Sequence, residues 1–91
     1  MSRASRTVLI VNKRGLHARA GAKLVTLASS QPVSLMVEKD GSSVTATSIM
    51  GLMMLGAAMG DSITISAEGD GAEPAVAALA ELVETKFGES D

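Results

Sequence analysis

The chain contains no cysteine, no tryptophan and no tyrosine, and Phe87 is its only aromatic residue. Without cysteine, disulfide bonds and thiolate metal sites are excluded, and the absence fits a reducing compartment. A formal charge of −2 and the near absence of aromatic side chains exclude the usual features of a nucleic-acid-binding protein. A single histidine without cysteine also makes a metal site unexpected.

Long apolar runs are absent from the N-terminal region, where the first run covers only residues 8–11. A signal peptide needs an apolar run of roughly 7 to 15 residues, and a membrane-spanning helix needs about 20. We therefore expect a cytoplasmic protein without membrane insertion. Residues 1–91 should form one domain, because a chain of this length does not support two hydrophobic cores.

Apolar periodicity and turn residues predict the element order β-α-β-β-α-β-α. The expected strands are residues 7–11, 33–38, 43–47 and 61–67, and the expected helices are residues 18–29, 48–55 and 73–86. Asp40 and Gly41 favour a two-residue hairpin turn between the second and third strands. One sheet covered by helices on a single face is the economical packing of these elements, which gives a two-layer α+β fold.

The end of the chain should continue the last helix and then fray. Val76, Leu79, Val83 and Phe87 recur at helical spacing, so Phe87 is expected on the apolar face of that helix. Residues 88–91 are expected to fray. Lys23, in the first predicted helix, is expected to be a solvated surface charge.

His17 lies where a predicted strand ends and a predicted helix begins. Helix N-termini carry free N–H groups and a partial positive charge, so they bind anions. An imidazole there can attack a phosphoryl donor and form a phosphoramidate. The backbone N–H groups of Ala18 and Arg19 and the guanidinium of Arg19 are suited to hold the phosphoryl oxygens. On local context alone, a helix cap or a solvated side chain is the more common role of such a histidine.

Ser48 precedes a short helix that is apolar nearly all round. Its plain interpretation is an N-cap that contributes about 1 kcal/mol. Leu52 and Leu55 share one side of this helix, and Met50, Met53 and Met54 fall on the other. Because a short helix on a two-layer domain cannot bury both sides, we expect an exposed methionine surface that adapts to partners. Filling of gaps in the core is an equally good interpretation of Met54.

Two segments resemble motifs of one family. Gly15-Leu16-His17-Ala18-Arg19 resembles the active-site signature of the HPr family, the histidine phosphocarriers of the phosphoenolpyruvate-dependent phosphotransferase system. Residues 48–56 resemble the regulatory-serine helix of that family, and the two segments lie about thirty residues apart, as the family requires. The resemblance covers nearly the whole chain and implies an HPr-like open-faced sandwich, with three helices on one face of a four-stranded antiparallel sheet.

The resemblance also implies a function. His17, assisted by Arg19, would accept a phosphoryl group from phospho-Enzyme I, the phosphoenolpyruvate-protein phosphotransferase, and pass it to an EIIA-type protein. The chain would then be a monomeric substrate of Enzyme I rather than an independent catalyst, and it would need no cofactor. A dedicated HPr kinase/phosphorylase would phosphorylate Ser48, regulatory proteins are further candidate partners, and the docking surface would comprise Ile49, Met50 and Met53.

The sequence departs from the family at Ala20 and Gly21, where members usually have proline and a small residue. Gly21 adds backbone freedom worth up to roughly 1 kcal/mol, so we expect a looser first turn and a less rigidly placed His17. Alanine at position 20 resembles the residue found there in some HPr proteins of the nitrogen-related phosphotransferase system. This resemblance favours a regulatory relay over sugar transport. A binding module switched by Ser48 is the main alternative function, although the presence of His17 favours the carrier. An unrelated α+β adaptor with a chance motif is a further alternative.

Overall fold

The structure, a computed structural model, describes residues 3–89, which form four strands, three α-helices and one short 3-10 helix. The order of strands and α-helices confirms the predicted β-α-β-β-α-β-α arrangement. None of the helices in this described range is long and apolar enough to cross a membrane. The strands are β1 (Arg3–Leu9), β2 (Leu35–Lys39), β3 (Ser42–Thr45) and β4 (Ser62–Glu68). The helices are α1 (Ala18–Ser29), α2 (Ile49–Leu55), α3 (Ala72–Glu84) and the 3-10 helix η1 (Lys86–Gly88).

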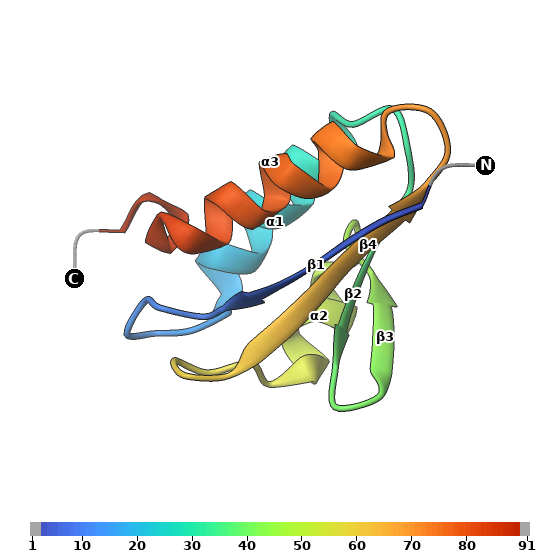
Figure 1. The fold of residues 1–91 in the computed structure, drawn as a ribbon. Helices are drawn as coiled ribbons and strands as arrows, with labels where there is room; N and C mark the ends of the chain where they lie inside the picture. Colours follow the sequence, from blue (N-terminus) through green and yellow to red (C-terminus); the bar gives the residue numbers. More distant parts are fainter. Residues whose placement is uncertain (1–2, 90–91) are drawn as a thin grey trace.

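The strands form one antiparallel sheet in the order β1-β4-β2-β3, so β4 lies between the two strands that flank α1 (Figure 1). Side chains alternate between the two faces of a strand, and the apolar ones point toward the helices. In β4 the buried residues are Ile63, Ile65 and Ala67. Val8 of β1 pairs with Ile63, and Val37 of β2 pairs with Ile65, so the register brings apolar residues together on one face.

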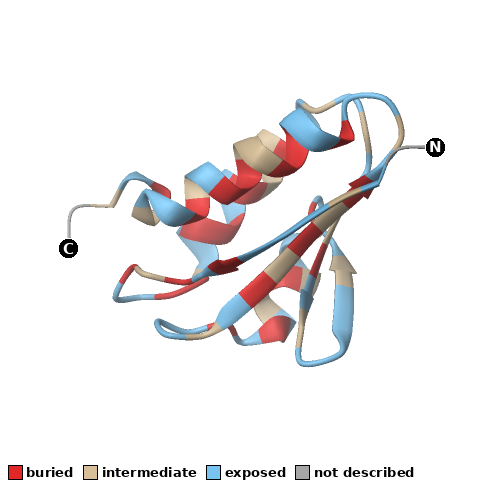
Figure 2. Cartoon of the chain, viewed as in Figure 1, coloured by how far each residue is buried: buried red, intermediate tan, exposed pale blue. Residues whose placement is uncertain are grey.

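The core lies between this face of the sheet and the helices, whose inner sides are buried (Figure 2). Burial of each large apolar side chain contributes about 1.5–3 kcal/mol to the free energy of folding. The fully buried large side chains include Leu24 of α1, Leu52 of α2 and Leu79 of α3. The predicted two-layer α+β fold is therefore confirmed.

The local predictions differ from the structure mainly at the first strand. Strand β1 begins at Arg3 rather than at residue 7, because its polar residues pair along the whole length of β4 at an edge of the sheet. Ile10 lies beyond the strand but still donates a backbone hydrogen bond to Asp61 (2.8 Å). The hairpin prediction is confirmed, since Asp40 and Gly41 have φ of 50° and 84°.

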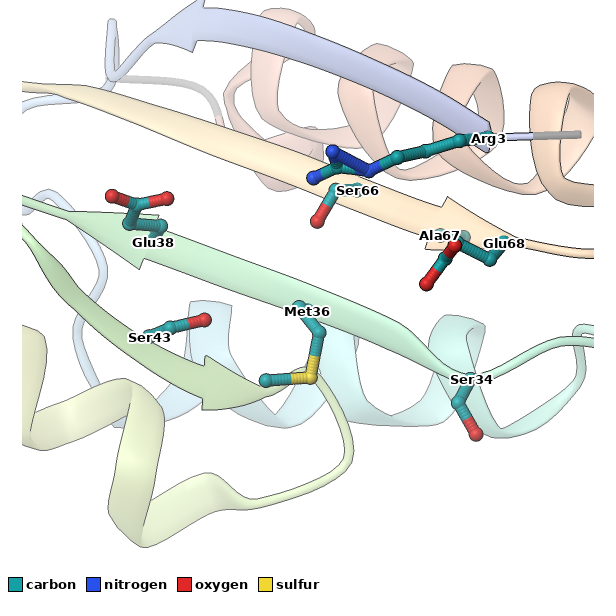
Figure 3. Close-up of a pocket in the computed structure, with 8 residues that line it drawn as sticks. All are labelled: Arg3, Ser34, Met36, Glu38, Ser43, Ser66, Ala67 and Glu68. Atoms are coloured by element: carbon teal, nitrogen blue, oxygen red, sulfur yellow. The ribbon is translucent and has the colours of Figure 1, made fainter.

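The other face of the sheet carries no helix within the described chain. Figure 3 looks onto this open face and shows the helices behind the strands. A shallow hollow of about 460 Å³ lies there, and its polar side chains are spread along the strands without hydrogen bonds or ion pairs to one another. It therefore offers no convergent polar groups. The lining residues are Arg3, Ser34, Met36, Glu38, Ser43, Ser66, Ala67 and Glu68.

The segment after α3 overturns two expectations. Helix α3 ends at Glu84, and Phe87 lies beyond it in η1, with φ of 55°. Phe87 is fully buried, as its apolar spacing suggested, but it does not lie on the face of α3. Residues 88 and 89 do not fray, because the N–H of Gly88 donates to Thr85 (3.0 Å) and the N–H of Glu89 donates to Lys86 (2.9 Å). Residues 90 and 91, also predicted to fray, lie outside the described residues.

Candidate functional site

Gly15 fixes the entry of the chain into α1. Its φ of +66° is a left-handed conformation that favours glycine. A Cβ at this position would lie 2.7 Å from the carbonyl oxygen of Ala57 and 2.8 Å from Cα of Ala58. The next N–H, that of Leu16, donates to the same Ala57 oxygen (2.9 Å). The turn before α1 is thus held tightly against the loop that follows α2, and His17 comes directly after it.

His17 is the N-cap residue of α1, in an extended conformation with φ of −80° and ψ of 178°. Its carbonyl accepts the first hydrogen bond of the helix, from the N–H of Gly21 (2.8 Å), but its side chain makes no capping hydrogen bond. The capping alternative therefore does not describe this side chain. The N–H groups of Ala18, Arg19 and Ala20 have no backbone acceptor among residues 3–89, as expected of a first helical turn.

Arg19 is exposed in the first turn of α1 and makes no ion pair within the described chain. A guanidinium beside free N–H groups at the positive end of a helix provides a set of donors for an anion. Residues 3–89 contain no group of three or more histidine, cysteine, aspartate or glutamate side chains that could hold a metal ion. The candidate anion site therefore consists of His17, the free N–H groups at the start of α1 and the guanidinium of Arg19.

The imidazole of His17 contacts a carboxylate that the sequence analysis missed. Nε2 of His17 pairs with Oε2 of Glu89, which is 72 residues away in the sequence. The other carboxylate oxygen accepts a hydrogen bond from Nδ2 of Asn12 (3.0 Å), and the same nitrogen donates to the carbonyl of Gly15 (2.8 Å). About 20 % of the His17 side chain is exposed, so the ring is held on one edge yet remains open to solvent.

Asn12, in the segment between β1 and α1, is completely buried. Its Oδ1 has no hydrogen-bond partner among the described residues. Its amide nitrogen donates to two acceptors, the carbonyl of Gly15 and the carboxylate of Glu89.

Residues 86–89, here called the strap, follow α3 and bring the carboxylate of Glu89 to the imidazole of His17 at the start of α1. Lys86 and Phe87 both have left-handed φ, of 61° and 55°, a conformation that costs roughly 1–2 kcal/mol per residue. The complete burial of Phe87 offsets this cost. Lys23 is exposed, as expected of a surface charge, but its Nζ also donates to the carbonyl of Phe87 (2.7 Å), a contact that the sequence did not predict.

Ser48 caps α2 as predicted, because its Oγ accepts a hydrogen bond from the N–H of Gly51 (3.0 Å). Gly56 ends the helix in a left-handed conformation, with φ of 62°. Leu52 and Leu55 are buried on the inner side of the helix, as the periodicity predicted.

The opposite side of α2 is exposed. The exposed fractions are 71 % for Met50 and 83 % for Met54, and Ile49 is also exposed. Met54 therefore does not fill a gap in the core. Met53 is half-buried instead, because its side chain packs against Gly21 of α1. Through this contact the methionine surface adjoins the helix that begins at His17.

Comparisons with known proteins define the class to which this fold and site belong. A family model described as "PTS HPr component phosphorylation site" matches residues 4–85. The phosphocarrier protein HPr of Cupriavidus necator is 42 % identical over 86 residues, which cover 94 % of this chain and 97 % of that protein. The crystal structure of HPr-C-His from Thermoanaerobacter tengcongensis is 48 % identical with a TM-score of 0.91, over 97 % of this chain and 99 % of that one.

The chain is thus a phosphocarrier protein of the phosphotransferase system and not an independent catalyst. It belongs to the HPr family. The phosphocarrier protein NPr of Shewanella violacea is also similar, with 40 % identity over 90 residues that cover 99 % of each chain. This similarity fits the nitrogen-related branch that the alanine at position 20 suggested.

Proposed function

We propose that this protein accepts a phosphoryl group on His17 from phospho-Enzyme I and passes it to a histidine of an EIIA-type protein. The observation that carries the proposal is the position of His17 at the N-terminus of α1, where its imidazole makes no capping hydrogen bond and lies beside free N–H groups. The N–H groups of Ala18 and Arg19 and the guanidinium of Arg19 would hold the phosphoryl oxygens. Partners would dock on Ile49, Met50 and Met53, which belong to the helix that packs on α1.

The test is incubation with Enzyme I and phosphoenolpyruvate, followed by measurement of the intact mass before and after acid treatment. We expect one acid-labile phosphoryl group, which is absent from the His17→Ala variant. A known HPr serves as the positive control. The carrier function is wrong if that control is labelled while this protein is not, or if His17→Ala is labelled as well as the wild type.

Ser48 would provide a regulatory site for an HPr kinase/phosphorylase. A phosphate at a helix N-terminus is tolerated by the helix dipole, but it adds a charge of about −1.5 to −2. That charge would lie next to the exposed apolar side chains of Ile49 and Met50 and oppose docking of a phosphoryl donor. An acid-stable phosphate that disappears in Ser48→Ala would support this role, and transfer of phosphate to other residues would exclude it.

We place the protein in a cytoplasmic relay of the nitrogen-related branch. The support is the alanine at position 20 and the similarity to an NPr. The test compares the rates at which the phosphorylated protein transfers its phosphoryl group to purified EIIA proteins of the nitrogen-related and sugar-transport branches. Faster transfer to a sugar-transport EIIA would overturn this assignment without affecting the carrier function.

A further inference from the structure

The chain has six methionines and no cysteine. A thioether is a soft, polarisable group that an oxidant converts to a sulfoxide, and a thiol would compete for the same oxidant. Since the chain has no thiol, its methionines are its most readily oxidised side chains. The exposure of each sulfur to solvent therefore decides where oxidation begins.

The methionines of helix α2 differ strongly in exposure. Met50 and Met54 have exposed fractions of 71 % and 83 %. Met53 is half-buried instead, because it packs against Gly21 of α1. Positions 50 and 54 are four residues apart, so their side chains are neighbours on the outer side of the helix. A peroxide dissolved in water thus reaches two adjacent sulfur atoms, while the sulfur of Met53 is partly shielded.

Two further methionines of the described chain lie outside this surface. Met36 is half-buried on the open face of the sheet, which carries no helix (Figure 3). Met59 is 56 % exposed and lies in the loop between α2 and β4. Met36 is thus a reference for partial burial, and Met59 is a reference for an exposed sulfur that does not belong to α2. Met1 lies outside the described residues.

We propose that Met50 and Met54 are sites of reversible oxidation by peroxides, and that the sulfoxide of Met50 weakens docking of the phosphoryl donor. The inference rests on the docking surface proposed for α2. In the forward step a sulfur lone pair attacks one oxygen of hydrogen peroxide, the O–O bond breaks, and after proton transfer the other oxygen leaves as water. A dithiol-dependent sulfoxide reductase reverses the change, because the sulfoxide oxygen leaves as water while two thiols become a disulfide.

Oxidation makes the outer side of α2 polar. A sulfoxide oxygen is a hydrogen-bond acceptor, which water satisfies at an exposed position but an apolar interface does not. Because Met50 and Met54 are mostly exposed, the fold loses little when they are oxidised, and the cost falls on the complex with the donor. A peroxide would therefore oppose phosphoryl uptake without any chemical change at His17.

The first experiment measures the order of oxidation. The intact protein is treated with increasing amounts of hydrogen peroxide, the excess is removed with catalase, and tandem mass spectrometry of peptides quantifies the sulfoxide at each methionine. We expect oxidation of Met50 and Met54 to be at least about threefold faster than that of Met36 and Met53, and this difference should disappear in urea. Equal rates in the folded protein, or faster oxidation of Met53, would overturn the proposal.

The second experiment measures the consequence for docking. Phosphorylation by Enzyme I and phosphoenolpyruvate is compared for the reduced protein, the oxidised protein, and the oxidised protein after treatment with a sulfoxide reductase and dithiothreitol. We expect oxidation to raise the KM of Enzyme I about tenfold, the effect of one unsatisfied acceptor, and the reductase to restore it. The midpoint of unfolding in urea should not change. An unchanged KM, or a rise in KM that accompanies loss of the fold, would overturn the proposal.

Two leucine variants identify the methionine responsible. Each variant is compared before and after oxidation, so that its own reduced form is the reference. In Met50→Leu, oxidation should leave the KM nearly unchanged, because leucine has no sulfur and Met54 is not among the proposed docking residues. Met59→Leu is the matched control, since it removes an exposed sulfur outside α2, and should show the same rise as the wild type. Equal rises in the two variants would overturn the role of Met50.

The carrier function and this inference fail in different ways. If the reduced wild type takes up no phosphoryl group where a known HPr does, the carrier function is wrong, and the role of Met50 in docking is wrong with it. The order of oxidation still tests the modification site by itself. If the reduced protein is phosphorylated and its KM does not respond to oxidation, the carrier function stands and the inference is wrong.

Discussion

Met53 of α2 packs directly on Gly21 of α1, where any larger residue would meet it. A Cβ at position 21 would lie 2.7 Å from Cε of Met53 and 3.1 Å from Cδ1 of Ile49. Gly21 thus has a packing role in addition to its effect on backbone freedom. It lets the proposed docking helix approach the helix that begins at His17.

Gly21→Ala should therefore alter docking more than stability. Alanine gains up to about 1 kcal/mol in helix propensity, and the displaced atoms are the mobile ends of two side chains. We expect the free energy of unfolding in urea to change by less than about 1 kcal/mol, while the KM of Enzyme I for this protein rises. An unchanged KM would show that Met53 and Ile49 move without consequence for the donor.

Ala22→Gly is the control for the backbone contribution. Ala22 is exposed in the same helix, so this variant should lose about 1 kcal/mol of stability from propensity alone. The KM of Enzyme I for Ala22→Gly should equal that for the wild type, because we expect the exposed position 22 not to contact α2.

Gly15→Ala should destabilise the fold through a backbone clash. The new Cβ would lie 2.7 Å from a carbonyl oxygen that is already held by Leu16. Gly56→Ala is a close control, since its φ is nearly the same (62° against 66°) and no atom lies within 4 Å of its Cβ position. We expect a loss of about 1 kcal/mol for Gly56→Ala and about 3 kcal/mol for Gly15→Ala, measured by urea unfolding. Equal losses would mean that the loop at residue 57 moves freely.

Local sequence signals predicted much of the fold. The bounds of α1 are those predicted, because its periodicity is bounded by a glycine-containing turn and a Gln-Pro pair. The cap at Ser48 and the hairpin at Asp40 and Gly41 were also predictable, since each depends on neighbouring residues only. Among the proposed site residues, His17 and Arg19 could be named from the resemblance of residues 15–19 to the family's active-site signature, because a helix start alone more often holds a capping or solvated histidine.

The remaining part of the site depends on contacts between distant residues. Glu89 joins His17 only because Lys86 and Phe87 adopt left-handed conformations, which neither residue type favours. The apolar spacing predicted that Phe87 continues the last helix. A buried residue in a turn after the helix gives the same apolar spacing, so the sequence did not distinguish the two cases. Gly21 predicted a flexible first turn from its residue type. Its contact with Met53 could not be predicted, because Met53 lies on another helix and the local sequence does not indicate the contact.

Met50→Gln tests the docking surface with little effect on the fold. Because 71 % of Met50 is exposed, its replacement by a polar residue of similar size should change the free energy of unfolding by less than about 0.5 kcal/mol. We expect the KM of Enzyme I to rise severalfold in steady-state transfer assays. Met36→Gln, on the open face of the sheet (Figure 3), is the control and should leave KM unchanged. Equal effects of the two variants would remove α2 from the interface.

Substitutions at Ser48 separate its capping role from its charge. Ser48→Ala removes the acceptor of the Gly51 N–H and should cost about 1 kcal/mol of stability. Ser48→Asp keeps a capping oxygen at a position where aspartate is favoured, so its stability should match the wild type. The aspartate still places a negative charge beside Ile49, so we expect a higher KM for Enzyme I in Ser48→Asp than in Ser48→Ala. If the two variants have the same KM although their stabilities differ as expected, a charge at this position does not control docking.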